Sequence, residues 1–417
     1  MGKQLKLLLL TEYFPPEIGA GSIRASEFAT RWSERANVTV LTAFPNYPQG
    51  IIPKQYRWKI FSKELKDTYT IIRSFIIPAA NTGILKRLIS YLTFMASSFF
   101  QGLFIIGKQD IIIASSPPLF VGIAAYLISR VKRMPYILEL RDLWPDILIE
   151  MGHLNNKFLI YLFKKIEFFL YKNSLHIVTV SPRVKEIIRN SGISGNKLSV
   201  ITNGVNLDFF SRNHKVKYKI NHISKGKFIV SYMGTLAYQY GLDNVLETAK
   251  LLKDREDILF LLVGEGPQKK EIKDKIEHSN LINVKLFDSV PLDQVRDYYT
   301  QVDIVLIPLR NLPLLESTIP VKLLESMAME IPVIINANGV ARDIMQAGKA
   351  GVYAEPDNPQ KLMEKILYLY ESGDIRKQMG KQGREHIKKH YDREKLANDY
   401  LALIDSLMNN KDISDST

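Results

Sequence analysis

The sequence predicts an α/β protein built from two Rossmann-like domains, each with a parallel sheet. Its 417 residues exceed one ordinary hydrophobic core, and a hydrophobic share of 46% is typical of a globular chain. Short apolar runs of strand length alternate with helical stretches in two series, and a polar, basic segment over residues 211–227 separates the series. This alternation indicates parallel strands covered by helices on both faces.

The first series begins with a strand over about residues 5–10. A loop that contains Gly19 and Gly21 follows, and then a helix over about 22–35. Glycines between a strand and a helix let the backbone approach a ligand at the helix N-terminus, as dinucleotide-binding folds do with phosphate. A flexible turn with Arg24 in solvent explains the pattern equally well. Further strands are expected over 38–42, 71–77, 110–115, 136–140, 176–180 and 198–202.

One helical stretch of this series, residues 88–107, carries no charge and is long enough to cross a bilayer. It lies between two strands of one predicted sheet, and a spanning helix would leave those strands on opposite sides of a membrane. Polar residues also recur along it at helical spacing. We therefore expect a crossover helix that is buried or lies at an interface. The polar residues are Ser90, Thr93, Ser97 and Gln101.

A second helical stretch, residues 157–172, combines four lysines on about a third of its circumference with six aromatic residues on the rest. This composition suits the headgroup boundary of a membrane. A core helix with snorkelling lysines is the alternative.

The second series has strands expected over 228–233, 258–263, 284–287, 304–307 and 333–335. Glycines at the ends of the first two strands, Gly234 and then Gly264-Glu265-Gly266, fall where open α/β sheets bind ligands. We expect four parts: a first domain over 1–210, a linker over 211–227, a second domain over 228–392, and a C-terminal helix over 393–417. For this helix, packing back on the first domain is one option.

Ser317 to Ile335 is the stretch with the clearest chemistry. Ser317 and Thr318 are N-cap types and Pro320 suits a first helical turn, so we expect a helix from there to about residue 330, followed by a buried strand.

Lys322 and Glu325 lie three residues apart in this helix and share a face near its N-terminal end, whose free N–H groups and dipole attract anions. A nucleoside diphosphate fits such a site, with the carboxylate on the ribose hydroxyls and the ammonium on phosphate oxygens. A solvated ion pair on a helix surface is the alternative.

Composition narrows the function further. No cysteine is present, which excludes a disulfide scaffold, thiolate metal sites and a cysteine nucleophile. The apolar run after Met1 is too short for a signal peptide, so we expect a cytoplasmic chain. Residues 1–210 carry a net charge of +12 and the remainder +1. A basic first half indicates a polyanion or an anionic membrane as its partner, and nucleic acid is not expected.

Several motifs together resemble a known family. They are ITNGVN at 201–206, VGEGP at 263–267 and PVKLLESMAMEIPVI at 320–334. With the two sheet domains, they are similar over nearly the whole chain to the retaining GT-B glycosyltransferases of family GT4. PPEIGAGSIR at 15–24 and ELRDLWPD at 139–146 are similar to a bacterial subgroup resembling the N-acetyl-L-fucosamine transferases of O-antigen and capsule assembly. The resemblance implies two Rossmann-like domains facing a cleft.

The resemblance also implies roles for particular residues. Glu325 matches the family's second Glu, which binds the nucleotide ribose. Arg141 occupies the place where many relatives have a His against the donor sugar, and Asp142 matches the Asp that often follows it. With Lys322, these residues are the candidate catalytic set. The candidate donor-binding residues are Gly19, Ala20, Gly21, Arg24, Gly234, Thr235, Gly264, Glu265, Gly266, Ser317, Thr318, Ile319, Pro320 and Glu325.

The chain departs from the family at three positions. Ser317 stands where the family has its first Glu, and Thr235 and Tyr240 stand where it has a phosphate-binding Arg and Lys. Neither Thr nor Tyr supplies the charge. We expect Lys322 to replace that charge, with help from Arg24 or Arg141.

The implied activity is that of a retaining hexosyltransferase with a nucleotide-sugar donor, UDP linked to an N-acetylated deoxysugar by the subgroup resemblance. The acceptor hydroxyl attacks from the leaving group's side and gives its proton to a phosphate oxygen. The chain has no Asp-x-Asp triplet, and we expect neither a metal nor another cofactor.

A basic domain with a lysine-rich aromatic helix suits a polyprenyl-diphosphate-linked saccharide acceptor at an anionic membrane surface. We expect peripheral association with the inner face of the cell membrane, in lipopolysaccharide, capsule or exopolysaccharide synthesis. Two alternatives remain: a nucleotide-sugar epimerase of the same fold, and a non-catalytic membrane-binding relative.

Overall fold

The structure is a computed structural model that describes residues 4–17, 19–47, 49–66, 68–79, 84–213, 216–219 and 226–415. It divides into two compact units. The first runs to Thr202 and resumes at Glu394, and the second is Asn203–Arg393. The boundary thus follows residue 202, whereas we expected it after residue 210. The expected linker at 211–227 belongs to the second unit, and its residues 214–215 and 220–225 lie outside the described ones.

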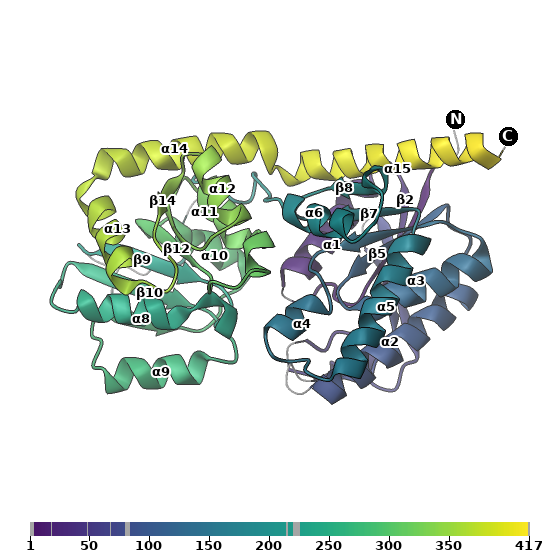
Figure 1. The fold of residues 1–417 in the computed structure, drawn as a ribbon, viewed down its shortest axis with the longest axis horizontal. Coiled ribbons are helices and arrows are strands. Elements are labelled where there is room, and N and C mark those ends of the chain that lie inside the picture. The colour runs from purple at the N-terminus through teal and green to yellow at the C-terminus, as the bar shows by residue number, and fades with distance from the viewer. Residues whose placement is uncertain are drawn as a thin grey trace. The chain divides into compact units, whose positions relative to one another are not determined.

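The first unit contains an eight-stranded sheet in the order β3-β4-β2-β1-β5-β6-β7-β8 (Figure 1). All neighbours are parallel except β3 and β4. Central strands such as β1 are apolar and buried because helices cover both faces. The strands are β1 Lys6–Thr11, β2 Asn37–Ala43, β3 Phe61–Lys66, β4 Tyr69–Ser74, β5 Ile111–Ser116, β6 Tyr136–Leu140, β7 His176–Thr179 and β8 Leu198–Val200.

Its helices are α1 Ala20–Trp32, α2 Ile84–Phe104, α3 Leu119–Lys132, α4 Asp146–Glu150, α5 Lys157–Asn173, α6 Pro182–Asn190 and the C-terminal α15 Arg393–Asp415; the 3-10 turns are η1 Lys54–Tyr56 and η2 Gly195–Lys197. Helices α1 and α15 pack on the same face of the sheet, and α2, α3 and α5 pack side by side as another layer.

The uncharged stretch falls mainly in α2, which also contains Lys86 and Arg87 and is the crossover between β4 and β5. Its polar stripe lies against its own domain: the Thr93 hydroxyl accepts a hydrogen bond from the Ile77 N–H at 3.0 Å, and Ser97 donates to the Phe75 carbonyl. The helices within the described ranges include none that is both long and apolar enough to cross a bilayer.

Helix α15 packs on the first unit. The Trp32 indole donates to the Ala397 carbonyl at 3.1 Å, and the Tyr400 ring meets the Trp32 and Phe28 rings edge to face. Arg31 pairs with Glu394 at 3.1 Å.

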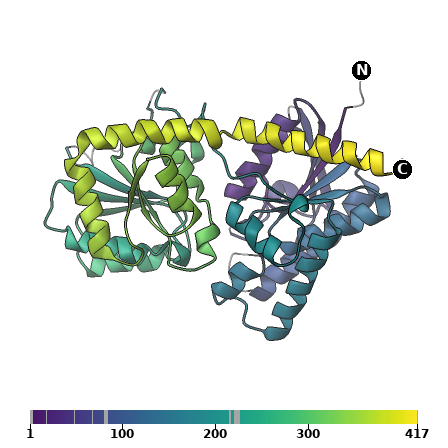
Figure 2. The same ribbon diagram turned by 45° about the horizontal axis from the view of Figure 1, so that its top comes forward.

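The second unit contains a six-stranded, all-parallel sheet in the order β11-β10-β9-β12-β13-β14 (Figure 2). The strands are β9 Phe228–Met233, β10 Ile258–Val263, β11 Val284–Phe287, β12 Ile304–Pro308, β13 Val333–Asn336 and β14 Gly351–Tyr353. The helices are α8 Leu242–Leu251, α9 Lys269–His278, α10 Leu292–Tyr299, α11 Val321–Ala328, α12 Val340–Ala347, α13 Pro359–Glu371 and α14 Gly373–His390, with 3-10 turns η3 Tyr238–Tyr240 and η4 Leu315–Ser317.

The predicted fold class is confirmed: two α/β domains, each built on a parallel sheet. Two strands were not predicted. β3 lies at a sheet edge and is mostly polar and charged, and β14 is only three residues long, so neither shows the apolar run that marks the central strands.

Candidate functional site

In the first unit, the carboxyl ends of β1 and β5 mark the place where the strand order reverses, which is where open α/β sheets bind ligands. The predicted glycine loop lies there. Gly19 precedes α1 as its N-cap residue, Ala20 and Gly21 form the first turn, and no side chain caps the helix. The free N–H groups of α1 therefore lie at the end of the sheet that suits an anion or a sugar.

Arg141 lies against this turn. A Cβ on Gly21 would come within 1.3 Å of Arg141 Nη1, so the missing side chain at position 21 makes room for the guanidinium. The Arg141 backbone N–H donates to the Ser116 carbonyl at 2.9 Å and Nη2 to the Pro117 carbonyl at 2.8 Å. The structure thus brings the candidates Gly21 and Arg141 together, while the Asp142 side chain is exposed on the same loop.

Arg24 is a correction to the donor-binding set. Its guanidinium is buried and pairs with Glu139 at 2.9 Å. Its remaining hydrogen bonds go to the backbone carbonyls of Ile201 and Thr202, at 2.9 and 2.6 Å. All three guanidinium nitrogens donate inside the domain, so Arg24 links α1 to β6 and to the residues that follow β8. Arg24 is therefore not placed to bind phosphate.

In the second unit, α11 is shorter than predicted at both ends. It spans Val321–Ala328, and Pro320, in extended conformation, is its N-cap residue. Ser317 belongs to the 3-10 turn η4, and its hydroxyl donates back to the Leu314 carbonyl at 2.6 Å. Ser317 and Thr318 therefore do not cap the helix, and its free N–H groups keep no side-chain partner.

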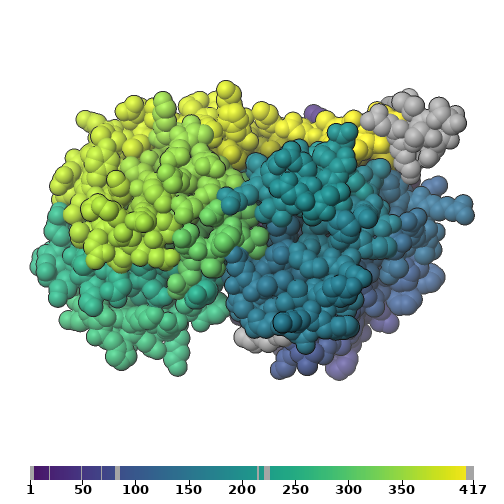
Figure 3. Space-filling model, viewed as in Figure 1, coloured from purple at the N-terminus to yellow at the C-terminus, as the bar shows by residue number. Residues whose placement is uncertain are grey.

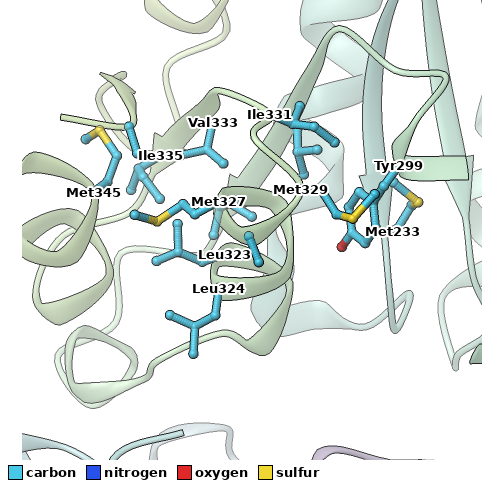
Figure 4. Packing of buried hydrophobic residues seen from close by; sticks show 14 of the residues in the cluster. Met233, Tyr299, Leu323, Leu324, Met327, Met329, Ile331, Val333, Ile335 and Met345 are labelled. Atoms are coloured by element: carbon cyan, nitrogen blue, oxygen red, sulfur yellow. The ribbon is translucent and has the colours of Figure 1, made fainter. Parts of the chain in front are cut away.

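The apolar face of α11 fixes this helix end in the domain core. Leu323, Leu324 and Met327 are fully buried and lie among Val333 and Ile335 of β13 (Figure 4). The preceding segment is held as well: Ile319 is buried in the same core, and its carbonyl accepts a hydrogen bond from Asn203 Nδ2 at 3.2 Å. The Ile319 side chain is thus part of the core and does not face a donor.

Lys322 has an unusual environment. It is 9% exposed, and its ammonium lies 3.9 Å from the ring centroids of both Tyr232 and Tyr240. Its Nζ has no hydrogen-bond partner. Burial lowers the pKa of Lys322 to about 7, and the nearby Glu325 carboxylate offsets this only in part. The alternative of a solvated surface ion pair is therefore wrong for Lys322.

The position of Lys322 bears on the departures from the family pattern. Tyr240 stands where the family resemblance implies a Lys, and the Lys322 ammonium lies over its ring. A Cβ on Gly234, next to the other departing position, Thr235, would come within 2.8 Å of Lys322 Nζ. Thr235 and Tyr240 carry no charge, but the Lys322 ammonium on α11 lies close to both positions in space.

Glu325 is partly buried, and the buried Tyr299 hydroxyl donates to its Oε2 at 3.2 Å. This bond holds the carboxylate on the side of α11 that also carries Lys322. Lys322 lies one turn closer to the N-terminus of the helix.

The glycines after β9 and β10 mainly allow two loops to pack on each other. A Cβ on Gly264 would lie 1.8 Å from the Gly234 carbonyl oxygen, and one on Gly266 would lie 2.2 Å from the Leu236 carbonyl oxygen. The Gly234 N–H in turn donates to Val263 at 2.9 Å. Gly264 and Gly266 therefore let their loop pack closely on the loop that carries Gly234 and Leu236, and their contact with the donor stays a prediction.

Glu265, between those glycines, is exposed and pairs with Lys269. Among the residues in the described ranges, no group of three or more His, Asp and Glu side chains is arranged to hold a metal ion.

Sequence reasoning missed the residues that surround these candidates. Tyr232 and Tyr299 were read only as strand and helix residues, although their rings and hydroxyls contact Lys322 and Glu325. Nothing local in the sequence marks them, because their partners lie 90 and 26 residues away along the chain.

Sequence comparison decides the family. Residues 23–209 match the Glycosyltransferase Family 4 domain, and residues 214–386 match the domain described as Glycosyl transferases group 1. The two matches follow one another and cover all strands of both sheets except β1. The chain belongs to the group 1, family 4-like GT-B glycosyltransferases.

Named relatives are distant. This glycosyltransferase is 24% identical to the putative colanic acid biosynthesis glycosyl transferase WcaI of Escherichia coli over 298 residues, which is 68% of this chain and 71% of the relative. It is 26% identical over 297 residues to the N,N'-diacetylbacillosaminyl-diphospho-undecaprenol alpha-1,3-N-acetylgalactosaminyltransferase of Campylobacter jejuni, which is 68% of this chain and 74% of the relative.

Among solved structures, the glycosyltransferase resembles Anabaena Alr3699/HepE in complex with UDP and glucose. The TM-score is 0.70 at 15% identity, and the match covers 97% of this chain and 100% of that protein. At this identity the likeness concerns the fold.

Proposed function

We propose that this glycosyltransferase moves a sugar from a nucleoside-diphosphate donor to a saccharide acceptor with retention of anomeric configuration. The observation that carries the proposal is Lys322, a buried ammonium without a hydrogen-bond partner at the N-terminal end of α11. A cation and free N–H groups at one point form a site for a diphosphate. Glu325, which Tyr299 orients, then accepts hydrogen bonds from the ribose hydroxyls.

In this reaction the bond between the anomeric carbon and the diphosphate oxygen breaks, and a bond from the acceptor oxygen forms on the same face of the sugar. The acceptor's proton passes to a phosphate oxygen. Negative charge develops on the departing diphosphate, so its stabilisation by Lys322 and the α11 N–H groups lowers the barrier. Arg141, backed by the Gly21 turn, and Asp142 are proposed to contact the donor sugar.

UDP is the proposed nucleotide and an N-acetylated deoxysugar the proposed sugar. The complex of Anabaena Alr3699/HepE with UDP and glucose supports the choice of nucleotide, and the subgroup motifs at 15–24 and 139–146 support the choice of sugar.

Calorimetric titration with UDP, GDP, ADP and dTDP tests the donor site. We expect UDP to bind with the highest affinity and Glu325→Ala to weaken binding at least tenfold, because the orienting contact to the ribose is lost. The matched control is Glu364→Ala, which alters an exposed carboxylate on α13 of the same unit that pairs with Lys361, and this variant should bind UDP normally. Absence of heat with all four nucleotides would refute the proposal. Conversion of a UDP-sugar without acceptor would indicate an epimerase instead.

We further propose a polyprenyl-diphosphate-linked saccharide as the acceptor, used in capsule, O-antigen or exopolysaccharide synthesis at the inner face of the cell membrane. The Campylobacter relative is named for a diphospho-undecaprenol acceptor, and the Escherichia relative for colanic acid biosynthesis.

The surface of the first domain supports a membrane partner. Helix α2 carries an exposed stripe without a charge, made of Leu85, Ile89, Leu92, Ala96, Phe100 and Phe104. Helix α5, in the same layer, exposes Phe158 and Tyr161 beside Lys157 and Lys165. Figure 3 shows the surface of the first unit that faces the viewer, with the residues around α5 in teal. An apolar stripe flanked by cations suits the headgroup region of an anionic bilayer.

Vesicle flotation tests this part. We expect the protein to float with vesicles of anionic phospholipid and less with phosphatidylcholine vesicles, and Phe100→Glu with Phe104→Glu to reduce flotation several-fold. Ile282→Glu, which alters an exposed apolar residue of the second unit, is the control. Equal flotation of all variants, or none for the unmodified protein, would refute membrane association.

A further inference from the structure

A narrow polar pocket opens in the first unit at the carboxyl ends of β1 and β2, apart from the residues discussed so far. It is lined mainly by Glu12, Tyr13, Asn46, Tyr47, Arg87 and Tyr91, which come from the loops after β1 and β2 and from α2. It has room for about one water-sized group.

Glu12 is the unexplained residue of this pocket. It is 2% exposed, and its Oε2 has no hydrogen-bond partner. Its backbone is fixed, because the carbonyl accepts hydrogen bonds from the Thr42 hydroxyl at 3.0 Å and the Ala43 N–H at 3.3 Å. Burial raises the pKa of Glu12 to about 8. At neutral pH the pocket therefore contains a mostly protonated carboxyl group with unused hydrogen-bonding capacity.

A neighbouring acid shows what a structural role looks like here. Glu17 is also buried, but its carboxylate accepts hydrogen bonds from the backbone N–H groups of Asn46, Tyr47 and Phe14, at 2.9, 2.8 and 3.3 Å. These bonds hold the two loops together. Glu12 Oε2 makes none, and leaving a buried polar atom unsatisfied is costly unless it serves a ligand or a water.

The other side of the pocket supplies donors. Arg87 Nε and Nη2 both bind the Tyr91 hydroxyl, at 3.0 and 2.6 Å, and the Tyr13 and Tyr47 rings meet edge to face with centroids 5.4 Å apart. A carboxyl group opposite an Arg–Tyr pair, between aromatic rings, complements a group that both donates and accepts. A sugar hydroxyl is such a group. A phosphate is not, because the pocket has room for only about one water-sized group.

We propose that this pocket receives one hydroxyl group of the acceptor saccharide, which hydrogen-bonds Glu12 Oε2, and that Glu12 is a specificity-determining residue for the acceptor. The assignment rests on the proposed transferase function. It concerns the first unit alone, whereas the donor candidates Lys322 and Glu325 lie in the second.

The test uses a short-chain polyprenyl-diphosphate N-acetylglucosamine as probe, together with its deoxy analogues, each lacking one hydroxyl. UDP release from the donor is measured with the unmodified enzyme and with Glu12→Ala. With the unmodified enzyme, we expect kcat/KM for one analogue to be roughly tenfold or more lower than kcat/KM for the parent probe. With Glu12→Ala, we expect the parent probe and that analogue to have similar kcat/KM values.

Two further variants separate binding from folding. Glu12→Gln keeps the shape of the side chain, and we expect a raised KM for the parent probe with kcat and UDP affinity within twofold of the unmodified enzyme. Glu167→Gln, which alters another buried carboxylate of the same unit, should leave the KM unchanged. Discrimination that persists in Glu12→Ala, or UDP binding without any probe-dependent release in the unmodified enzyme, would overturn the assignment. Loss of UDP binding in the unmodified enzyme would instead refute the donor site.

Discussion

At the residue scale, Lys322 determines the account of the donor site. A lysine usually avoids the interior, since burial disfavours its charged form. Here two tyrosine rings and the α11 terminus surround it, and its pKa falls to about 7. Such a residue carries a cost in the empty protein that a bound anion offsets.

Replacing Lys322 should therefore separate stability from binding. We expect Lys322→Met, similar in length and apolar, to raise Tm by a few degrees while UDP affinity falls at least tenfold. Differential scanning calorimetry and UDP titration of the same preparation measure both. A lowered Tm together with unchanged UDP affinity would show that the lysine is structural.

Glu12 should be visible in the pH dependence of stability. The unfolded chain loses this proton near pH 4.5 and the folded chain only near pH 8, so the folded state binds the extra proton between these values. The stabilising contribution is complete below pH 4.5 and is lost as pH rises to 8. We expect Glu12→Gln to flatten the decline of unfolding free energy across this window, measured by urea titration. An unchanged slope would contradict the raised pKa.

At the scale of elements, the sequence predicted the strands far better than the helix ends. The runs 228–233, 258–263 and 284–287 coincide with β9, β10 and β11, because buried parallel strands are continuous apolar runs. The start of α11 was misplaced because Ser317 and Thr318 have the right residue types for a cap, but the backbone is extended at Thr318 and Pro320 before the helix begins. Local propensity cannot show that.

Side-chain partners were harder still. Arg24 was read as a cation free to bind phosphate, but its partner Glu139 lies 115 residues away on β6. Lys322 and Glu325 could be proposed from helical spacing and family resemblance, whereas the tyrosines around them follow from the sheet arrangement. These contacts depend on tertiary packing.

Gly264 and Gly21 both follow a strand in the sequence, but replacing each with alanine should have different effects on stability. At Gly264 the added Cβ meets a backbone carbonyl at 1.8 Å, so we expect a loss of stability on the order of 2 kcal/mol or more and weaker UDP binding. At Gly21 it meets the movable end of Arg141, so stability should change by less than about 1 kcal/mol while donor turnover falls. Urea unfolding and UDP-release assays measure both. Equal losses of stability would contradict the packing difference.

At the scale of the whole molecule, the C-terminal helix belongs with the first unit although the second unit precedes it in sequence. Tyr400 is fully buried against Trp32 and Phe28. We expect Tyr400→Ala to cost about 3 kcal/mol or more by leaving a cavity. UDP affinity at 20 °C should stay within twofold, because Lys322 and Glu325 lie in the other unit. A parallel loss of UDP affinity would show that the donor site depends on the first unit's core.

The most direct test of the central claim, that Lys322 binds the donor diphosphate, is the proton balance of UDP binding at pH 8. Free Lys322, with a pKa of about 7, is mostly neutral at this pH, and a bound diphosphate favours its charged form. Calorimetry in buffers of different ionisation enthalpy should show uptake of close to one proton per UDP bound, with affinity falling as pH rises above 7 and both effects absent in Lys322→Met. Binding of UDP to the unmodified enzyme without proton uptake would contradict the claim.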